Sequence, residues 1–277
     1  MKILALDTSS QSASCAILED DKLLGEFYGN VNLTHSQTIM PMVESLLTQT
    51  RVALSEIGLF AVTEGPGSFT GLRIGLSAVK GMAHALEKPC AGVSTLEALA
   101  WNLCGPDCVV APVLDARCSQ VYTALFRWKD GVLIRLAPDE AITIKELSTR
   151  LKNLGTCVLL VGDGAKMCYT ILKDELPGLG LVSPAARFTR AASVALAAQR
   201  IAASGASRAA DCRAGRHGRA GCAGPRLPAF AAGGTGTAGK TKECLKLQIG
   251  LGDGDNDSFG CRSRRICPQG GGPALAG

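Results

Sequence analysis

The sequence has 277 residues, of which 47% are hydrophobic and 19% are charged, so it can bury an ordinary core as one large domain or two small ones. Its formal net charge of +5 is unevenly distributed: residues 1–203 carry −1, whereas residues 204–277 carry +6 and 17 of the 33 glycines. The basic balance therefore belongs to the last part of the chain. The positive net charge of the whole chain is therefore no reason to expect residues 1–203 to bind nucleic acid.

The sequence predicts no membrane segment, because it contains no run of 18 apolar residues. The apolar stretch before Asp7 is too short for a signal peptide, so we expect a cytoplasmic protein. Seven of the twelve cysteines are scattered singly through residues 1–203, and in a reducing compartment we expect them to be buried thiols. Cys104 and Cys108 lack a second ligand pair, so no metal site is predicted there.

The first half of the chain predicts strands followed by helices. Apolar runs and polar turns indicate strands at residues 2–7, 14–18, 23–28 and 59–62. Helical spacing indicates helices at residues 35–50 and 70–86, and a capping box of Ser94 and Glu97 starts a third that ends near Leu103. Thr34 is the expected N-cap of the first helix, and Pro41 inside it predicts a kink or an offset start.

The second half repeats this order of elements. A shift of 108 residues aligns Asp7 with Asp115, and each follows an apolar strand and precedes a polar turn. Strands are predicted at residues 109–114, 121–128 and 158–161, and helices near residues 144–152, 165–176 and 191–203. This internal repeat predicts a duplicated α/β fold with a first lobe at 1–107 and a second, incomplete lobe at 108–203.

The densest motif is the segment Glu64–Gly75, in which a strand ends, the chain turns through glycines and a helix begins. Free backbone N–H groups at such a helix start can bind an anion. One reading is therefore an anion or nucleotide site, whose residues would be Asp7, Gly65, Gly67, Gly71 and Asp115. The other reading is a tight turn that needs glycine for positive φ and close helix packing. Spacing alone leaves both open.

Five segments together resemble the TsaB (YeaZ) family: Lys2–Ser9, Thr34–Ser36, Gly65–Gly75, Leu76–Ser94 and Val113–Arg117. The resemblance covers residues 1–203. It implies an actin-like (ASKHA, ribonuclease H-like) fold of two related lobes, in agreement with the internal repeat. It also implies a non-catalytic scaffold or activator subunit of the machinery that adds threonylcarbamoyl to adenosine in tRNA.

The resemblance further implies partners and a surface that binds them. The partners would be a TsaD-like catalytic homologue, a TsaE-like ATPase and a second copy of the chain, with tRNA reached indirectly through the complex. The surface would lie on the first two helices, and we expect about half of its apolar arc to be domain core. Its candidate residues are His35, Ile39, Met40, Met42, Val43, Leu46, Gly71 and Gly75.

The residues favour a chain without catalytic groups, metal or cofactor of its own. The turns after Asp7 and Asp115 lack the glycine that a phosphate-binding turn needs, so each aspartate is expected to accept backbone hydrogen bonds instead. His35 has Ile39 and not a second histidine one turn on, so we interpret it as a hydrogen-bonding residue at a helix start. The alternatives are a small-molecule kinase or ATPase of the same fold, and an inactive glycoprotease-like (M22-type) homologue.

Residues 204–277 differ in composition from the rest and are predicted to be a disordered, Gly/Arg/Cys-rich tail. The expected family ending is absent, which suggests a reading-frame shift near Ser204. Within the tail, Gly234–Thr241 matches the phosphate-binding pattern G-x-x-x-x-G-K-T. Its surroundings lack the strands that such a loop requires, so an accidental match is favoured over nucleotide binding.

Overall fold

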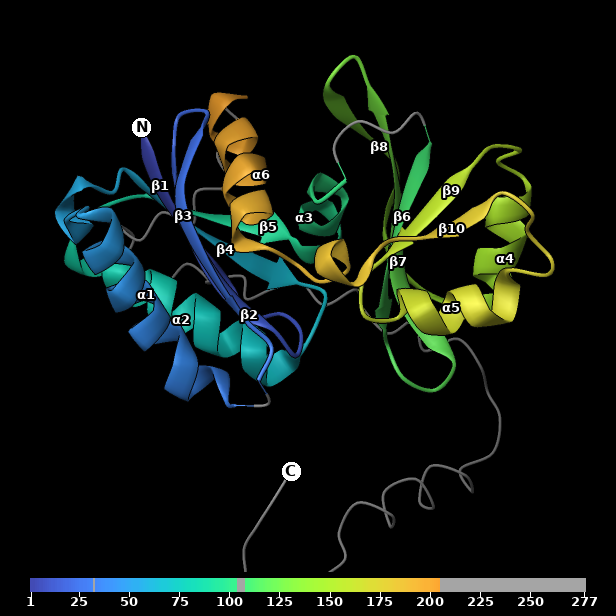
Figure 1. Ribbon diagram of the computed structural model, residues 1–277, viewed down its shortest axis with the longest axis horizontal. Helices are drawn as coiled ribbons and strands as arrows, with labels where there is room; N and C mark the ends of the chain where they lie inside the picture. The colour runs from blue at the N-terminus through green and yellow to red at the C-terminus, as the bar shows by residue number, and fades with distance from the viewer. Residues whose placement is uncertain (32, 104–107, 205–277) are drawn as a thin grey trace, which may run out of the picture. The chain divides into compact units, whose positions relative to one another are not determined.

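The computed structural model describes residues 1–31, 33–103 and 108–204 (Figure 1). The predicted tail beyond Ser204, the segment Gly234–Thr241 within it and Cys104 lie outside these residues. The helices are α1 His35–Thr50, α2 Phe69–Ala85, α3 Thr95–Trp101, α4 Ile144–Lys152, α5 Ala165–Leu172 and α6 Ala191–Ala203, with single 3-10 turns at Leu54–Glu56 and Pro184–Ala186. None of the helices in this part of the chain has the length and hydropathy needed to cross a bilayer.

The first sheet has five strands, and β1 lies at its centre. The strands are β1 Lys2–Asp7, β2 Ala13–Glu19, β3 Lys22–Gly29, β4 Leu59–Gly65 and β5 Cys90–Ser94. Their order is β3-β2-β1-β4-β5. Strands β1, β2 and β3 pair antiparallel, whereas β1 with β4 and β4 with β5 pair parallel.

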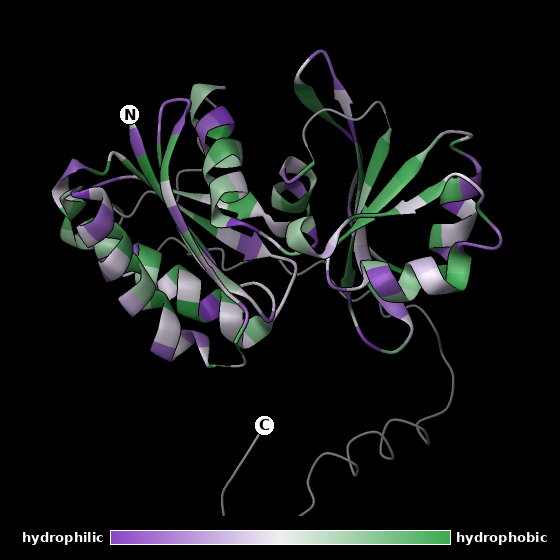
Figure 2. Ribbon diagram, viewed as in Figure 1, coloured by the Kyte–Doolittle hydropathy of each residue, from purple (hydrophilic) through white to green (hydrophobic). Residues whose placement is uncertain are grey.

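The second sheet repeats the first, strand for strand. Its strands are β6 Val109–Asp115, β7 Gln120–Lys129, β8 Val132–Thr143, β9 Val158–Val161 and β10 Leu179–Leu181. Their order is β8-β7-β6-β9-β10, again with three antiparallel strands and two parallel ones. Figure 2 shows apolar residues concentrated in the central strands β6 and β9. The sheet order confirms the duplication predicted from Asp7 and Asp115, which end the two central strands.

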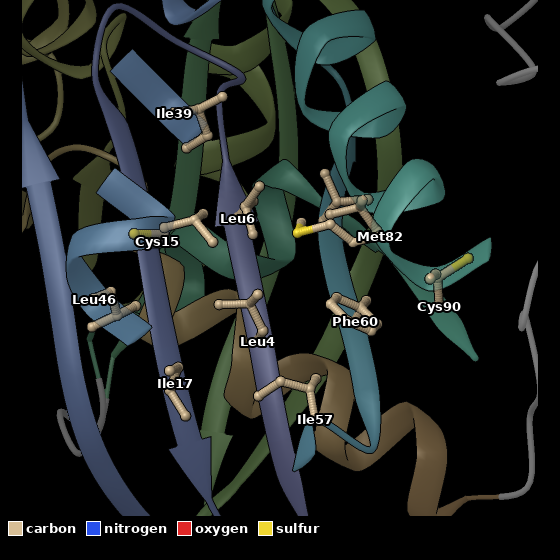
Figure 3. Close-up of a cluster of buried hydrophobic side chains, with 14 of the residues drawn as sticks. Leu4, Leu6, Cys15, Ile17, Ile39, Leu46, Ile57, Phe60, Met82 and Cys90 are labelled. Carbon is tan, nitrogen blue, oxygen red and sulfur yellow. The ribbon is translucent and has the colours of Figure 1, made fainter. Parts of the chain in front are cut away.

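Helices α1 and α2 cover one face of the first sheet. Ile39, Val43 and Leu46 recur at helical spacing and point into this core, where they meet Leu4 and Phe60 of the sheet (Figure 3). The predicted bounds of α1 are confirmed, and Pro41 is accommodated inside the helix. Helices α4 and α5 cover the corresponding face of the second sheet.

The other face of each sheet is covered by a helix from the opposite half of the sequence. Helix α6 packs on the first sheet through alanines and Val194, next to Ile3 and Ala5. Helix α3 packs on the second sheet through Leu96 and Leu99. The packing of these two helices therefore crosses the predicted boundary between 1–107 and 108–203, and α3 also meets α6 and the first sheet through Ala98. Both faces of each sheet are apolar and must be shielded from water, and α6 and α3 cover the second face of the first and second sheet, respectively.

Three observed strands, β5, β8 and β10, were not among those expected from the sequence. Each lies at the edge of its sheet. Edge strands are partly exposed, so they lack the continuous apolar run of a central strand. The polar residues of β8, such as Arg135 and Asp139, and the proline at 138 obscure its alternation further.

The cysteines follow the expected burial in part. Cys15, Cys90, Cys108 and Cys168 are buried, whereas Cys118 and Cys157 are exposed. Burial raises the pKa of the Cys15 thiol to about 12 and that of Cys168 to about 11. The prediction of buried thiols is thus wrong for Cys118, which lies in a turn, and for Cys157, which directly precedes β9.

The burial of α3 can be tested by comparing a buried leucine with an exposed one. We expect Leu99→Ala to lower the free energy of unfolding by about 2–5 kcal/mol, because Leu99 is fully buried against the second sheet. The matched control Leu23→Ala removes the same atoms from an exposed position of β3 and should change it by about 0.5 kcal/mol or less. Urea denaturation measures both, and equal losses would contradict this packing.

Candidate functional site

Asp7 lies at the carboxyl end of β1 and is fully buried. Its Oδ1 accepts hydrogen bonds from the Ser9 backbone N–H at 3.2 Å, the Ser9 hydroxyl at 2.7 Å and the Thr63 hydroxyl at 2.8 Å. Its Oδ2 is buried and has no partner among the described residues. Loss of solvent raises the pKa of the Asp7 carboxyl, and the Ser9 and Thr63 hydrogen bonds oppose that shift.

Asp115 repeats part of this arrangement in the second sheet. Its Oδ1 accepts a hydrogen bond from the Arg117 backbone N–H at 2.7 Å, which matches the Asp7 bond to the residue two positions on. Asp115 is exposed, and its own N–H donates to Asp163 Oδ1 at 3.0 Å. Both aspartates thus accept backbone hydrogen bonds at the mouths of their turns, as the sequence predicted.

The turn after β1 packs directly against the start of α2. The Ser68 N–H donates to the Ser9 carbonyl oxygen at 2.7 Å, and the Thr8 hydroxyl donates to the Gly71 carbonyl oxygen at 2.8 Å. A Cβ atom at Gly67 would overlap the Ser9 carbonyl oxygen, and one at Gly71 would overlap that of Thr8. At Gly75 it would overlap the Thr8 hydroxyl. The absence of a side chain at these glycines therefore permits the turn after β1 to pack directly against the start of α2.

This contact favours the reading of the glycine segment as a tight turn. The Ser68 hydroxyl caps the helix by accepting from the Gly71 N–H, and the Ser9 carbonyl occupies the Ser68 N–H. The carbonyl oxygens that face Gly67 and Gly71 would repel an anion. The surroundings of Gly67 and Gly71 therefore argue against the predicted anion site at these two residues. The Asp7 side chain beside them is buried and does not reach solvent. Gly65 is half-buried and has positive φ, as a tight turn requires, and Asp115 lies on the other sheet.

His35 begins α1 and lies next to the same junction. Its Nε2 is 2.8 Å from the Ser10 carbonyl oxygen, which confirms that it is a hydrogen-bonding residue at a helix start. A Cβ atom at Gly71 would lie 3.1 Å from the imidazole ring, so His35 is tightly packed there. Among the residues that the structure describes, no three His, Cys, Asp or Glu side chains are grouped as metal ligands would be.

A groove of about 500 Å³ runs between α1 and α2. Two large apolar side chains on its walls are exposed to solvent, Met40 of α1 by 45% and Phe69 of α2 by 59%. The guanidinium of Arg73 lies over the Phe69 ring, 3.8 Å from its centre. The lining residues are Ser36, Ile39, Met40, Phe69, Thr70, Arg73, Ile74, Ser77 and Ala78.

The structure agrees with the expectation that about half of the apolar arc on α1 is core, and it narrows the list of candidate interface residues. Ile39, Val43 and Leu46 belong to the core, and of these Ile39 alone contributes to the groove. The glycines at 71 and 75 are also buried, because they face Thr8. Met42 is partly buried against the same core, so Met40 remains the exposed apolar candidate on α1.

Phe69 and Arg73 were not identified from the sequence. They are four residues apart at the start of α2, a spacing that places two side chains on the same face of a helix. That spacing was the available signal, but it does not reveal that Phe69 remains exposed. The groove thus has a mostly apolar lining with one cation at its margin, which suits a protein partner.

The close contact at Gly75 can be tested against a second glycine of the same helix. We expect Gly75→Ala to lower the free energy of unfolding by about 1–3 kcal/mol, because the new methyl group overlaps the Thr8 hydroxyl. Gly81→Ala meets no atom within 4 Å and should raise it by up to about 1 kcal/mol through helix propensity. In a Thr8→Ala background the cost of Gly75→Ala should shrink, and an unchanged cost would contradict the contact.

The buried carboxyl of Asp7 predicts a pH dependence of stability. Because its folded pKa is raised above the ordinary 3.8, its ionised form costs stability at neutral pH. That cost disappears as the pH falls through the folded pKa towards 3.8. Asp7→Asn lacks this titration, so the wild type should gain stability relative to the variant over that window. Denaturation midpoints at several pH values measure the difference, and parallel curves would contradict it.

Comparison with known proteins gives concordant matches. The protein-family model described as "TsaD: tRNA N6-adenosine threonylcarbamoyltransferase" matches residues 29–220. The tRNA threonylcarbamoyladenosine biosynthesis protein TsaB of Bacillus subtilis is 35% identical over 187 residues, which cover 68% of this chain and 82% of that protein. TsaB of Escherichia coli is 35% identical over 168 residues, 59% of this chain and 72% of that protein.

The fold agrees with these sequence matches. The solved structure of YeaZ from Pseudomonas aeruginosa superposes with a TM-score of 0.64 and 27% identity, covering 74% of this chain and 93% of that one. The two matching five-stranded sheets form the duplicated α/β fold that the internal repeat predicted, and this fold is similar to that of YeaZ. The chain belongs to the TsaB (YeaZ) family of tRNA threonylcarbamoyladenosine biosynthesis proteins.

Proposed function

We propose that this chain is a non-catalytic scaffold and activator in the synthesis of threonylcarbamoyladenosine on tRNA. Its α1–α2 groove would hold a TsaD-like transferase homologue. The observation that carries the proposal is the groove, in which Met40 and Phe69 are exposed. The glycine segment beside it is covered by the turn after β1, which accepts a hydrogen bond from the Ser68 N–H.

The closed junction supports a role without catalysis. A kinase or ATPase of this fold needs backbone N–H groups that face a phosphate. Here the Ser68 N–H donates to Ser9 and the Gly71 N–H to the Ser68 hydroxyl. Asp7 is enclosed and cannot contact a ligand without movement of the turn. The residues that would bind nucleotide thus stabilise the first lobe instead.

The groove supports a role in binding. Exposed apolar side chains on two adjacent helices lose water when a partner helix covers them, which favours association. The unbranched Met40 side chain can adapt to the shape of a partner. Binding that favours one conformation of the transferase would raise the population of its competent state, and this is how a chain without catalytic groups activates another.

The wider assembly follows from the same role. A TsaE-like ATPase and tRNA would join through the complex, and a second copy of this chain could occupy the groove when the transferase is absent. A cytoplasmic location fits a protein that serves tRNA modification.

The docking role is tested by placing a charge in the groove. We expect Met40→Asp to weaken binding of the TsaD-like homologue by about tenfold or more, because the partner would bury an unpaired carboxylate. Met167→Asp is the matched control: Met167 is exposed by 38%, but on α5 of the second lobe. Isothermal titration calorimetry with the purified homologue measures both affinities.

Two controls accompany this measurement. Equal thermal midpoints of the two variants would show that neither loses its fold. Titration of the chain with ATP should give no heat, whereas nucleotide binding that depends on Asp7 would favour the kinase or ATPase alternative. If Met40→Asp bound the homologue with the affinity of the wild type, the groove would not be the binding surface.

A further inference from the structure

Two crossings of the chain join the two sheets, and α3 lies where they meet. The first crossing runs from α3 to β6, and the second runs from β10 to α6. Helix α3 directly follows β5 of the first sheet, yet its Leu96 and Leu99 pack against the second sheet (Figure 1). Its Ala98 belongs to the core that α6 shares with the first sheet. A change in the angle between the sheets must therefore move α3 against one of them.

Asn102 attaches the carboxyl end of α3 to the second crossing. Its Nδ2 donates to the Ala186 carbonyl oxygen at 3.0 Å and to that of Phe188 at 2.7 Å, and its Oδ1 accepts from the Ser193 hydroxyl at 2.7 Å. The two carbonyl oxygens can only accept, which defines the orientation of the amide. One side chain, with both donors and its acceptor in use, thus connects α3, the second crossing and α6.

The second crossing is also bonded to both sheets. The Gly162 N–H, directly after β9, donates to the Arg187 carbonyl oxygen at 2.8 Å. Three residues on, Arg190 pairs at 2.6 Å with the buried carboxylate of Glu26 in β3 of the first sheet. That carboxylate also accepts from the Ala192 N–H of α6 at 3.1 Å. A hinge needs residues that are free to change φ and ψ, and this short passage is bonded at both ends.

The amino end of α3 is attached to the second sheet as well. The Ser94 hydroxyl, which caps α3, donates to Asp139 Oδ2 of β8 at 2.6 Å. The Arg135 guanidinium of β8 pairs with Glu97 of α3 at 3.0 Å and also with Asp139. Ser94 and Asn102 are separated by about 12 Å along the helix. Because α3 is held at two separate points, a rotation about either one strains the other.

We propose that α3 fixes the angle between the two sheets, with Asn102 as the positioning residue, so that the sheets do not open and close about a hinge. Polar networks in which every member is satisfied favour one arrangement. Movement at this point would break the hydrogen bonds of Asn102 and leave the part-buried carbonyl oxygens of Ala186 and Phe188 without their donor. The inference concerns the chain by itself and goes beyond its proposed binding role.

The test measures the distance between the two sheets in the full chain. Spin labels are attached through non-natural amino acids at Gln49 of α1 and Lys166 of α5, which are exposed and leave the native cysteines unchanged. Pulsed electron paramagnetic resonance then gives the distribution of distances. Asn102→Ala is compared with Asn153→Ala as the matched control, because both asparagines follow the last turn of a helix but Asn153 is exposed.

We expect one narrow distribution for the wild type and for Asn153→Ala, and a distribution at least about twofold broader for Asn102→Ala. Arg135→Gln loosens the other end of α3 at a partly exposed site and should broaden it to a smaller extent. Hydrogen exchange gives a second readout: the Gly162 amide should exchange about tenfold faster or more in Asn102→Ala, because its bond to Arg187 opens more often.

A broad distribution in the wild type would overturn the proposal. If Asn102→Ala folds and keeps the width and the Gly162 exchange rate of the wild type, Asn102 does not position the sheets and the proposal fails. If Asn102→Ala does not fold, the wild type and Arg135→Gln decide, and an Arg135→Gln distribution as narrow as that of the wild type would contradict the role of α3. None of these measurements involves the TsaD-like homologue, so the proposed function is tested separately.

Discussion

The contact between the turn after β1 and the start of α2 constrains the rest of the first lobe. The Thr8 and Ser9 carbonyl groups approach the helix so closely that Gly67 and Gly71 have no room for a side chain. The contact aligns α2 against the sheet and uses the N–H groups of Ser68 and Gly71 within the chain. These residues thus stabilise the structure of the first lobe, and on the outward side of α1 and α2 the side chains of Met40 and Phe69 are exposed.

The exchanged helices explain how two similar lobes form one unit. Each sheet is covered on one face by helices from its own half and on the other by α3 or α6 from the opposite half. Neither half can bury both faces of its sheet alone, so the lobes depend on each other for their cores. The first sheet as a whole is therefore packed between residues from both ends of the described chain, with α1 and α2 on one face and α6 on the other.

The sequence predicted the parts of this structure that have strong periodicity or repetition. The bounds of α1 and the equivalence of Asp7 and Asp115 were visible, because apolar spacing and internal duplication depend on local pattern alone. The edge strands and the destinations of α3 and α6 were not, since an alanine-rich helix carries little information about which sheet it covers. For the site, the apolar arc of α1 was visible. Only packing separates the buried Ile39 from the exposed Met40 beside it.

The central claim is that this chain acts through a partner and not by its own chemistry. The most direct measurement is threonylcarbamoyl transfer to tRNA with the TsaD-like homologue alone, this chain alone and the two mixed at increasing ratios. The account predicts no product from this chain alone and a rate for the homologue that rises with added chain until the partners are stoichiometric. Product formed by this chain alone, or a rate of the homologue that does not respond to it, would contradict the account.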